Sequence, residues 1–174
     1  MMSSMAPVET GREVGPAATT GRIVDGQHVL TVRVYFEDTD ASGIVYHANY
    51  LRFMERGRTE FCRLLGVEQS AMMADERYRV FALHSCRLRF LRPARVDDRL
   101  EVVSRVVDVG AAAIDVEQTI RCAGQDVMQG AVRVALIDQT GRPRRLPPAM
   151  RDAFVRHKLA RQQTDQRMDQ KTES

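Results

Sequence analysis

Residues able to do acid–base or nucleophilic chemistry gather in one short segment, EDTDASGIVYHANY, at positions 37–50. Asp38 and Asp40 lie among turn-forming residues, and His47 follows seven positions after Asp40. An aspartate that is ionised at neutral pH can attack a carbonyl carbon or act as a general base on water. Aspartate is also favoured in turns and caps, so spacing alone leaves a structural role open and does not separate Asp38 from Asp40.

Two regular elements flank this segment and must position it. Before it, apolar residues alternate with polar ones from Leu30 to Glu37, which predicts a half-buried strand. After it, apolar residues recur at intervals of three and four over about 49–65, which predicts a helix that ends near Gly66. The first N–H groups of a helix have no acceptor within it, so its start near His47 can stabilise an oxyanion.

The remainder of the chain predicts one sheet. Period-two apolar patterns cover residues 79–91, 99–108, 112–122 and 126–138, with breaks rich in Gly and Pro between them. We interpret these as four consecutive antiparallel strands, followed by a last helix within 146–160. The fold class is α+β, with one main helix packed on a sheet of five strands. A single helix cannot cover both faces of such a sheet, so we expect a partner subunit to bury the other face or an edge.

The composition and the cysteine spacing indicate a single globular domain. A chain of 174 residues with 44% apolar and 28% charged residues is typical of one globular domain. We expect a flexible extension over 1–27, the folded domain over 28–157 and a polar tail over 158–174. The three cysteines show no CxxC spacing, which argues against a disulfide framework or zinc site. Without a long apolar stretch or secretory signal, we expect a cytoplasmic protein that does not span a membrane.

The long motif YFEDTDASGIVYHANYLRFMERGRTEF, residues 35–61, resembles the signature of the hotdog-fold acyl-CoA thioesterases of the 4-hydroxybenzoyl-CoA type. The resemblance is greatest to the branch associated with the bacterial Tol-Pal cell-envelope system, and it extends to RFLRPARVDDRLEV (89–102) and RPRRLP (142–147). It implies a five-stranded antiparallel sheet wrapped around one long central helix. It also implies subunits that pair edge to edge as a homodimer or homotetramer.

The resemblance further implies roles for individual residues. Asp40 is the catalytic carboxylate, Asp38 supports the turn, and His47 offers its backbone N–H to the thioester carbonyl and its ring to orient water. Glu55 is a reserve carboxylate, because another hotdog branch takes its catalytic acid from this helix. The expected substrate-binding residues are Tyr46, Asn49, Tyr50, Arg92 and Arg144, with an acyl pocket near Phe53 and Met54. Other arginines that can hold CoA phosphates are Arg87, Arg89, Arg95, Arg142 and Arg145.

Hydrolysis of acyl-CoA to a free acid and CoA is therefore the first functional hypothesis. It requires no metal and no cofactor, since coenzyme A is part of the substrate. The alternative is a non-catalytic module that binds acyl carrier protein or proteins of lipid synthesis and the cell envelope. Nucleic-acid binding is a weaker hypothesis, because the chain has a net charge of only +3 and no nucleic-acid motif. A dehydratase is disfavoured because no hydratase-like histidine motif is present.

Overall fold

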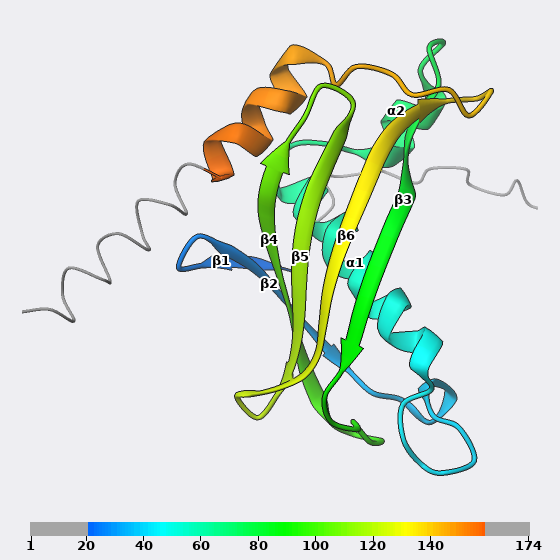
Figure 1. Ribbon diagram of the computed structural model, residues 1–174, viewed down its shortest axis with the longest axis vertical. Coiled ribbons are helices and arrows are strands. Elements are labelled where there is room, and N and C mark those ends of the chain that lie inside the picture. Colours follow the sequence, from blue (N-terminus) through cyan, green and yellow to red (C-terminus); the bar gives the residue numbers. More distant parts are fainter. Residues whose placement is uncertain (1–20, 159–174) are drawn as a thin grey trace, which may run out of the picture.

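The computed structural model describes residues 21–158, which form an antiparallel sheet with a long helix across one of its faces (Figure 1). Of the predicted terminal segments 1–27 and 158–174, residues 1–20 and 159–174 lie outside the described residues. The strands are β1 (Arg22–Val24), β2 (Gln27–Arg33), β3 (Arg79–Phe90), β4 (Arg99–Val109), β5 (Ala113–Cys122) and β6 (Gln125–Asp138). The helices are the 3₁₀ turn η1 (Phe36–Asp38), α1 (His47–Leu64), α2 (Gln69–Ala74) and a last helix over 148–158.

The predicted α+β class and hotdog architecture are confirmed, with two differences in the sheet. The strand order in the described part of the chain is β1-β2-β4-β5-β6-β3, so β3 pairs with β6 and not with β4. Residues 91–98 carry the chain from one edge strand, β3, across to β4. The four strands are therefore consecutive in sequence but not in space.

The second difference is a sixth strand among the described residues, where the sequence predicts five. β1 lies within the segment that the sequence analysis assigns to a flexible extension. Asp25 and Gly26 both have positive φ, 48° and 69°, between the paired residues Val24 and Gln27. Two left-handed residues make the tight turn whose twist matches a two-stranded hairpin. The folded domain therefore begins several residues before position 28.

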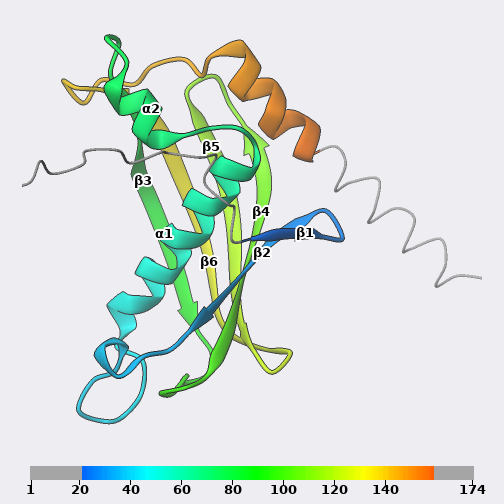
Figure 2. The ribbon, with the colours of Figure 1, turned by 180° about the vertical axis from the view of Figure 1, so that it is seen from behind.

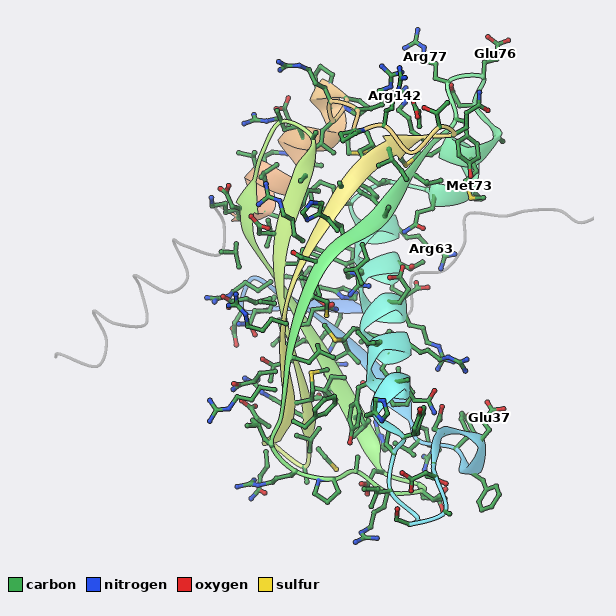
Figure 3. The ribbon with its side chains drawn as sticks, turned by 45° about the vertical axis from the view of Figure 1, so that its right-hand side comes forward. Glu37, Arg63, Met73, Glu76, Arg77 and Arg142 are labelled. Carbon is green, nitrogen blue, oxygen red and sulfur yellow. The ribbon has the colours of Figure 1, made fainter. Side chains whose placement is uncertain are left out.

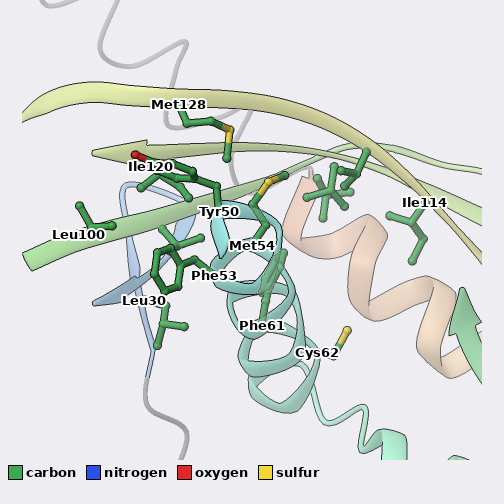
Figure 4. Packing of buried hydrophobic residues seen from close by; sticks show 14 of the residues in the cluster. Leu30, Tyr50, Phe53, Met54, Phe61, Cys62, Leu100, Ile114, Ile120 and Met128 are labelled. Atoms are coloured by element: carbon green, nitrogen blue, oxygen red, sulfur yellow. The ribbon is translucent and has the colours of Figure 1, made fainter. Parts of the chain in front are cut away.

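The core lies between α1 and the concave side of the sheet, as Figure 4 shows. Alternate residues of β4, β5 and β6 point toward α1, and Leu100, Ile120 and Met128 are fully buried there. Phe53 and Met54 of α1 fill the opposite side of this layer and are also fully buried. Burial of each such side chain contributes about 1.5–3 kcal/mol, which fixes α1 on the sheet.

α1 crosses the sheet on one side, which Figure 2 shows from behind, and it leaves the edge strand β3 open. The loop that precedes α1 lies at one end of the sheet, and the connection after β6 lies at the opposite end. Glu37 and Arg142 mark these two ends in Figure 3. None of the described helices combines the length and apolar composition needed to cross a membrane.

Candidate active site

Residues 39–45 form a small loop that is held at its base. Thr39 and Val45 form an antiparallel bridge, and within the loop the Asp40 N–H donates to the Ile44 carbonyl at 3.0 Å. The Val45 N–H donates to the Ala94 carbonyl at 2.8 Å, which fastens the loop to the segment after β3. These bonds fix the backbone of Asp40 against that segment.

The Asp40 carboxylate is exposed, and hydrogen bonds from Ser42 in the same turn stabilise its negative charge. The Ser42 N–H donates to its Oδ1 at 2.8 Å. The hydroxyl and the N–H of Ser42 lower the pKa of Asp40 below its ordinary value, with smaller contributions from the Ile44 backbone and from the charge of His47. The carboxylate is therefore ionised at neutral pH, as a nucleophile or general base must be.

Asp38 is buried and has a different role from Asp40. Its Oδ2 accepts the Tyr35 N–H at 2.9 Å, and its carbonyl accepts the Tyr46 N–H and the Asn49 side-chain amide, each at 2.9 Å. Asp38 and Asn49 thus hold the entry to α1 in place. The two carboxylates, which spacing alone does not distinguish, differ in exposure and in their hydrogen-bond partners.

His47 is the first residue of α1, and Tyr46 before it has extended backbone. The N–H of His47 belongs to the first turn, where no intrahelical acceptor exists. The imidazole is exposed, and its ring centroid lies 4.3 Å from that of Tyr46. The helix start thus offers a donor and a positive field beside the Asp40 loop.

A groove of about 460 Å³ joins these elements. Four predicted site residues line it together, namely Asp40, His47, Tyr50 and Arg92. The Tyr50 hydroxyl accepts the Ala94 N–H at 3.1 Å, so this side chain anchors the wall of the groove. Arg92 is exposed and donates to Gln125. An ionised carboxylate, a helix start and a cation therefore face one open groove.

Other predicted site residues lie elsewhere. Tyr46 packs on His47 and does not line the groove, and buried Asn49 donates to the Asp38 carbonyl. Arg144 pairs with Asp138 at 2.7 Å at the opposite end of the sheet. The expected acyl-pocket residues Phe53 and Met54 are fully enclosed in the core.

The remaining candidates are also away from Asp40. Glu55, the reserve carboxylate, lies about two turns after the start of α1. It pairs with Arg58 and lines a different pocket. Arg87 and Arg89 lie on β3 and point to the face away from α1, since their neighbours Cys86 and Leu88 pair with inward residues of β6. The Arg95 N–H donates to Asp98, and its side chain is not part of the groove lining.

Five apolar residues that line the groove are not among the predicted site residues, namely Ile44, Val45, Phe90, Leu91 and Pro93. The Phe90 ring lies 5.6 Å from that of Tyr50. The sequence signal that could have indicated Phe90, Leu91 and Pro93 is the end of the period-two pattern at RFLRP, which predicts that a strand ends at these residues. Within residues 21–158 no group of three or more His, Cys, Asp or Glu side chains is arranged to hold a metal ion.

Comparison with known proteins identifies the family. The Thioesterase-like superfamily matches residues 34–154. The acyl-CoA thioesterase YbgC of Haemophilus influenzae is 37% identical over 116 residues, which cover 67% of this chain and 85% of the relative. The 1,4-dihydroxy-2-naphthoyl-CoA hydrolase of a Synechococcus species is 30% identical over 128 residues, covering 70% and 84% of the two chains. The crystal structure of a probable thioesterase from Bartonella henselae superposes with a TM-score of 0.68 at 37% identity, covering 70% of this chain and 99% of that one. The chain belongs to the Thioesterase-like superfamily.

Proposed function

We propose that this protein hydrolyses acyl-CoA thioesters to a free carboxylic acid and CoA. The observation that carries the proposal is the groove in which the ionised Asp40 and the start of α1 at His47 meet. The relatives named as acyl-CoA thioesterase and naphthoyl-CoA hydrolase act on the same class of bond, which supports this choice.

The geometry assigns a task to each group. The thioester carbonyl oxygen accepts the His47 N–H, so negative charge that develops on this oxygen meets the positive end of α1. Asp40 either attacks the carbonyl carbon, giving a mixed anhydride that water then cleaves, or removes a proton from the attacking water. In both routes the C–S bond breaks, and CoA leaves as the thiolate that takes up a proton. The reaction as proposed uses no metal and no redox cofactor.

Asp40→Asn tests the assignment. Asparagine keeps an oxygen that accepts the Ser42 N–H but cannot ionise, so we expect kcat to fall at least about 100-fold with little change in melting temperature. Purified protein is assayed against short, long and aromatic acyl-CoAs. Asp152→Asn, an exposed aspartate on the last helix, is the matched control. Undiminished turnover in Asp40→Asn would remove Asp40 from the mechanism.

We also propose that the working unit is a homodimer or a dimer of dimers, joined through β3. This strand has 12 residues, lies at the sheet edge and is the most exposed of the long strands in the described region. Leu83 and Phe90 on its α1 side are about half exposed. Antiparallel pairing of β3 with a second copy of itself satisfies its free N–H and C=O groups and covers these side chains. Sedimentation of the 19.7 kDa chain as a monomer at micromolar concentration would contradict this.

The cellular setting proposed here follows from the resemblance. We propose that the enzyme acts in the cytoplasm, belongs to the Tol-Pal-associated branch, and has acyl carrier protein or lipid-synthesis proteins as macromolecular partners. Size-exclusion chromatography with purified acyl carrier protein tests the contact directly. Independent elution of the two proteins, combined with turnover of acyl-CoA, would limit the function to hydrolysis of the free thioester.

A further inference from the structure

The turn PARVDD, residues 93–98, lies in the connection from β3 to β4 and is held in place by its own bonds and by the chain that leaves β2. Within the turn, the Asp98 carboxylate accepts the Arg95 N–H at 2.8 Å, and Asp97 has a positive φ of 68°. The Asp98 carbonyl accepts the Val34 N–H at 2.9 Å, and the Asp97 N–H donates to the Val34 carbonyl at 3.0 Å. The turn therefore has a fixed position beside the segment that follows β2.

Ala94 of this turn joins α1 to the loop that carries Asp40. It is fully buried, its N–H donates to the Tyr50 hydroxyl at 3.1 Å, and its carbonyl accepts the Val45 N–H at 2.8 Å. Val45 in turn forms an antiparallel bridge with Thr39, and Asp40 lies between these two residues in the sequence. The backbone of Ala94 thus connects a helix side chain to the loop in which Asp40 is held.

Tyr50 is fixed in position and offers little surface to a substrate. It follows His47 by three residues on α1, which is about 4.5 Å along the helix axis. Its ring centroid lies 6.3 Å from that of Phe53 and 5.6 Å from that of Phe90, and Figure 4 shows it within the buried cluster. Although Tyr50 lines the groove, only 3% of its surface is exposed. The side chain is therefore better suited to holding neighbouring groups than to binding substrate.

The Asp40 loop is joined to α1 on two sides. At its entry, the Asn49 side-chain amide donates to the Asp38 carbonyl at 2.9 Å. On its far side, the loop is joined to α1 through Ala94 and the Tyr50 hydroxyl. A segment that is held on one side can pivot, whereas one that is held on both sides cannot. Loss of the Tyr50 hydroxyl should therefore leave the loop folded but free to shift relative to the start of α1.

We propose that Tyr50 is a positioning residue, whose hydroxyl acts through Ala94 to hold Asp40 at the distance from the start of α1 that the reaction requires. This rests on the proposed thioesterase function. Asp40 must reach the carbonyl carbon while the His47 N–H binds the carbonyl oxygen, so the loop and the helix start have to keep one separation. The 93–98 turn then has a task in the reaction, because it transmits the position of Tyr50 to the Asp40 loop.

Tyr50→Phe tests the proposal by removing only the hydroxyl. We expect kcat for acyl-CoA to fall at least about tenfold, because a misplacement of about 1 Å can cost about 100-fold in rate. KM should stay within about twofold of the wild type, since the buried ring has little contact with substrate. Tyr78→Phe, a partly buried tyrosine just before β3, is the control and leaves both constants unaltered. A raised KM with unchanged kcat, or no change in either, would overturn the proposal.

A double variant distinguishes positioning of Asp40 from a general loss of structure. Asp40→Asn has no carboxylate left to position, so adding Tyr50→Phe to it should lower kcat by less than about twofold. If Tyr50→Phe lowers kcat by the same factor in Asp40→Asn as in the wild type, the hydroxyl does not act through Asp40 and the proposal is wrong. Lack of hydrolysis by the wild type itself would contradict the thioesterase function instead, so the two failures are distinct.

Discussion

His28 makes the stability of this fold sensitive to mild acid. The side chain belongs to β2, is fully buried, and stacks on Phe61 of α1 with ring centroids 5.2 Å apart. Neither of its ring nitrogens has a hydrogen-bond partner among the described residues. Burial lowers the pKa of His28 from 6.5 to about 4; Glu60 opposes this shift, and His157 adds to it slightly.

The sign and size of the effect follow from proton linkage. In the unfolded chain His28 takes up a proton as the pH falls below 6.5, whereas the folded chain excludes that proton until about pH 4. The contribution to folding is therefore present above pH 6.5 and is lost as the pH falls toward 4. A pKa difference of this size corresponds to about 3 kcal/mol at full titration, of which about 2 kcal/mol is lost between pH 7 and pH 5.

Urea unfolding at pH 7, 6 and 5 measures the loss, with His28→Phe as the comparison. Phenylalanine keeps a ring against Phe61 but does not titrate, so we expect its unfolding free energy to change much less over this range. Asp108, Asp126 and Asp138 have lowered pKa values, but they titrate below this window. Equal pH dependence in the two proteins would refute the reasoning. If His28→Phe does not fold, an NMR titration of the wild type that gives His28 a pKa above 6 would refute it equally.

The position of each long strand could be predicted because its signal is local. In β5 the buried residues Ile114, Val116 and Ile120 alternate with exposed or partly exposed ones, and Gly124 follows the strand. The pairing of β3 with β6 could not be predicted in this way, because alternation reports which face of a strand is buried and not which strand lies beside it. β1 could not be predicted for a different reason. Its three residues are all exposed, so no pattern of alternating burial accompanies the Asp25–Gly26 turn.

The candidate site could also be predicted only where its residues are close together in the sequence. The motif places Asp40, His47 and Tyr50 in one groove, because a short loop and a helix start hold them within a few residues of one another. Arg92 lies beside these residues because the nearby Ala94 N–H donates to the Tyr50 hydroxyl. Tyr50 and Ala94 are 44 residues apart, so no local sequence pattern predicts this contact. Arg144 lies far from Asp40 within the subunit, and this could not be predicted, because a basic motif gives charge but not the end of the sheet at which a strand finishes.

Two further predictions probe the subunit contact and the helix–sheet contact. Cys86 lies near the centre of the exposed part of β3, so mild oxidation should link two chains, because directly opposed residues in an antiparallel pair lie about 4.5–5.5 Å apart. Cys86→Ser should abolish the link and Cys122→Ser should not; a link that survives Cys86→Ser would mean that Cys86 does not lie opposite its own copy in the dimer. Gly57→Ala should destabilise the fold by about 1–3 kcal/mol although alanine favours helix, because the added Cβ would lie 2.8 Å from Val102 and 3.3 Å from Gln118. Both neighbours are buried, and Gln118 also bonds Arg58 and Ser104, so neither can move away without loss. A urea midpoint for Gly57→Ala at or above that of the wild type would mean that α1 is free to shift on the sheet, and that this contact does not fix its position.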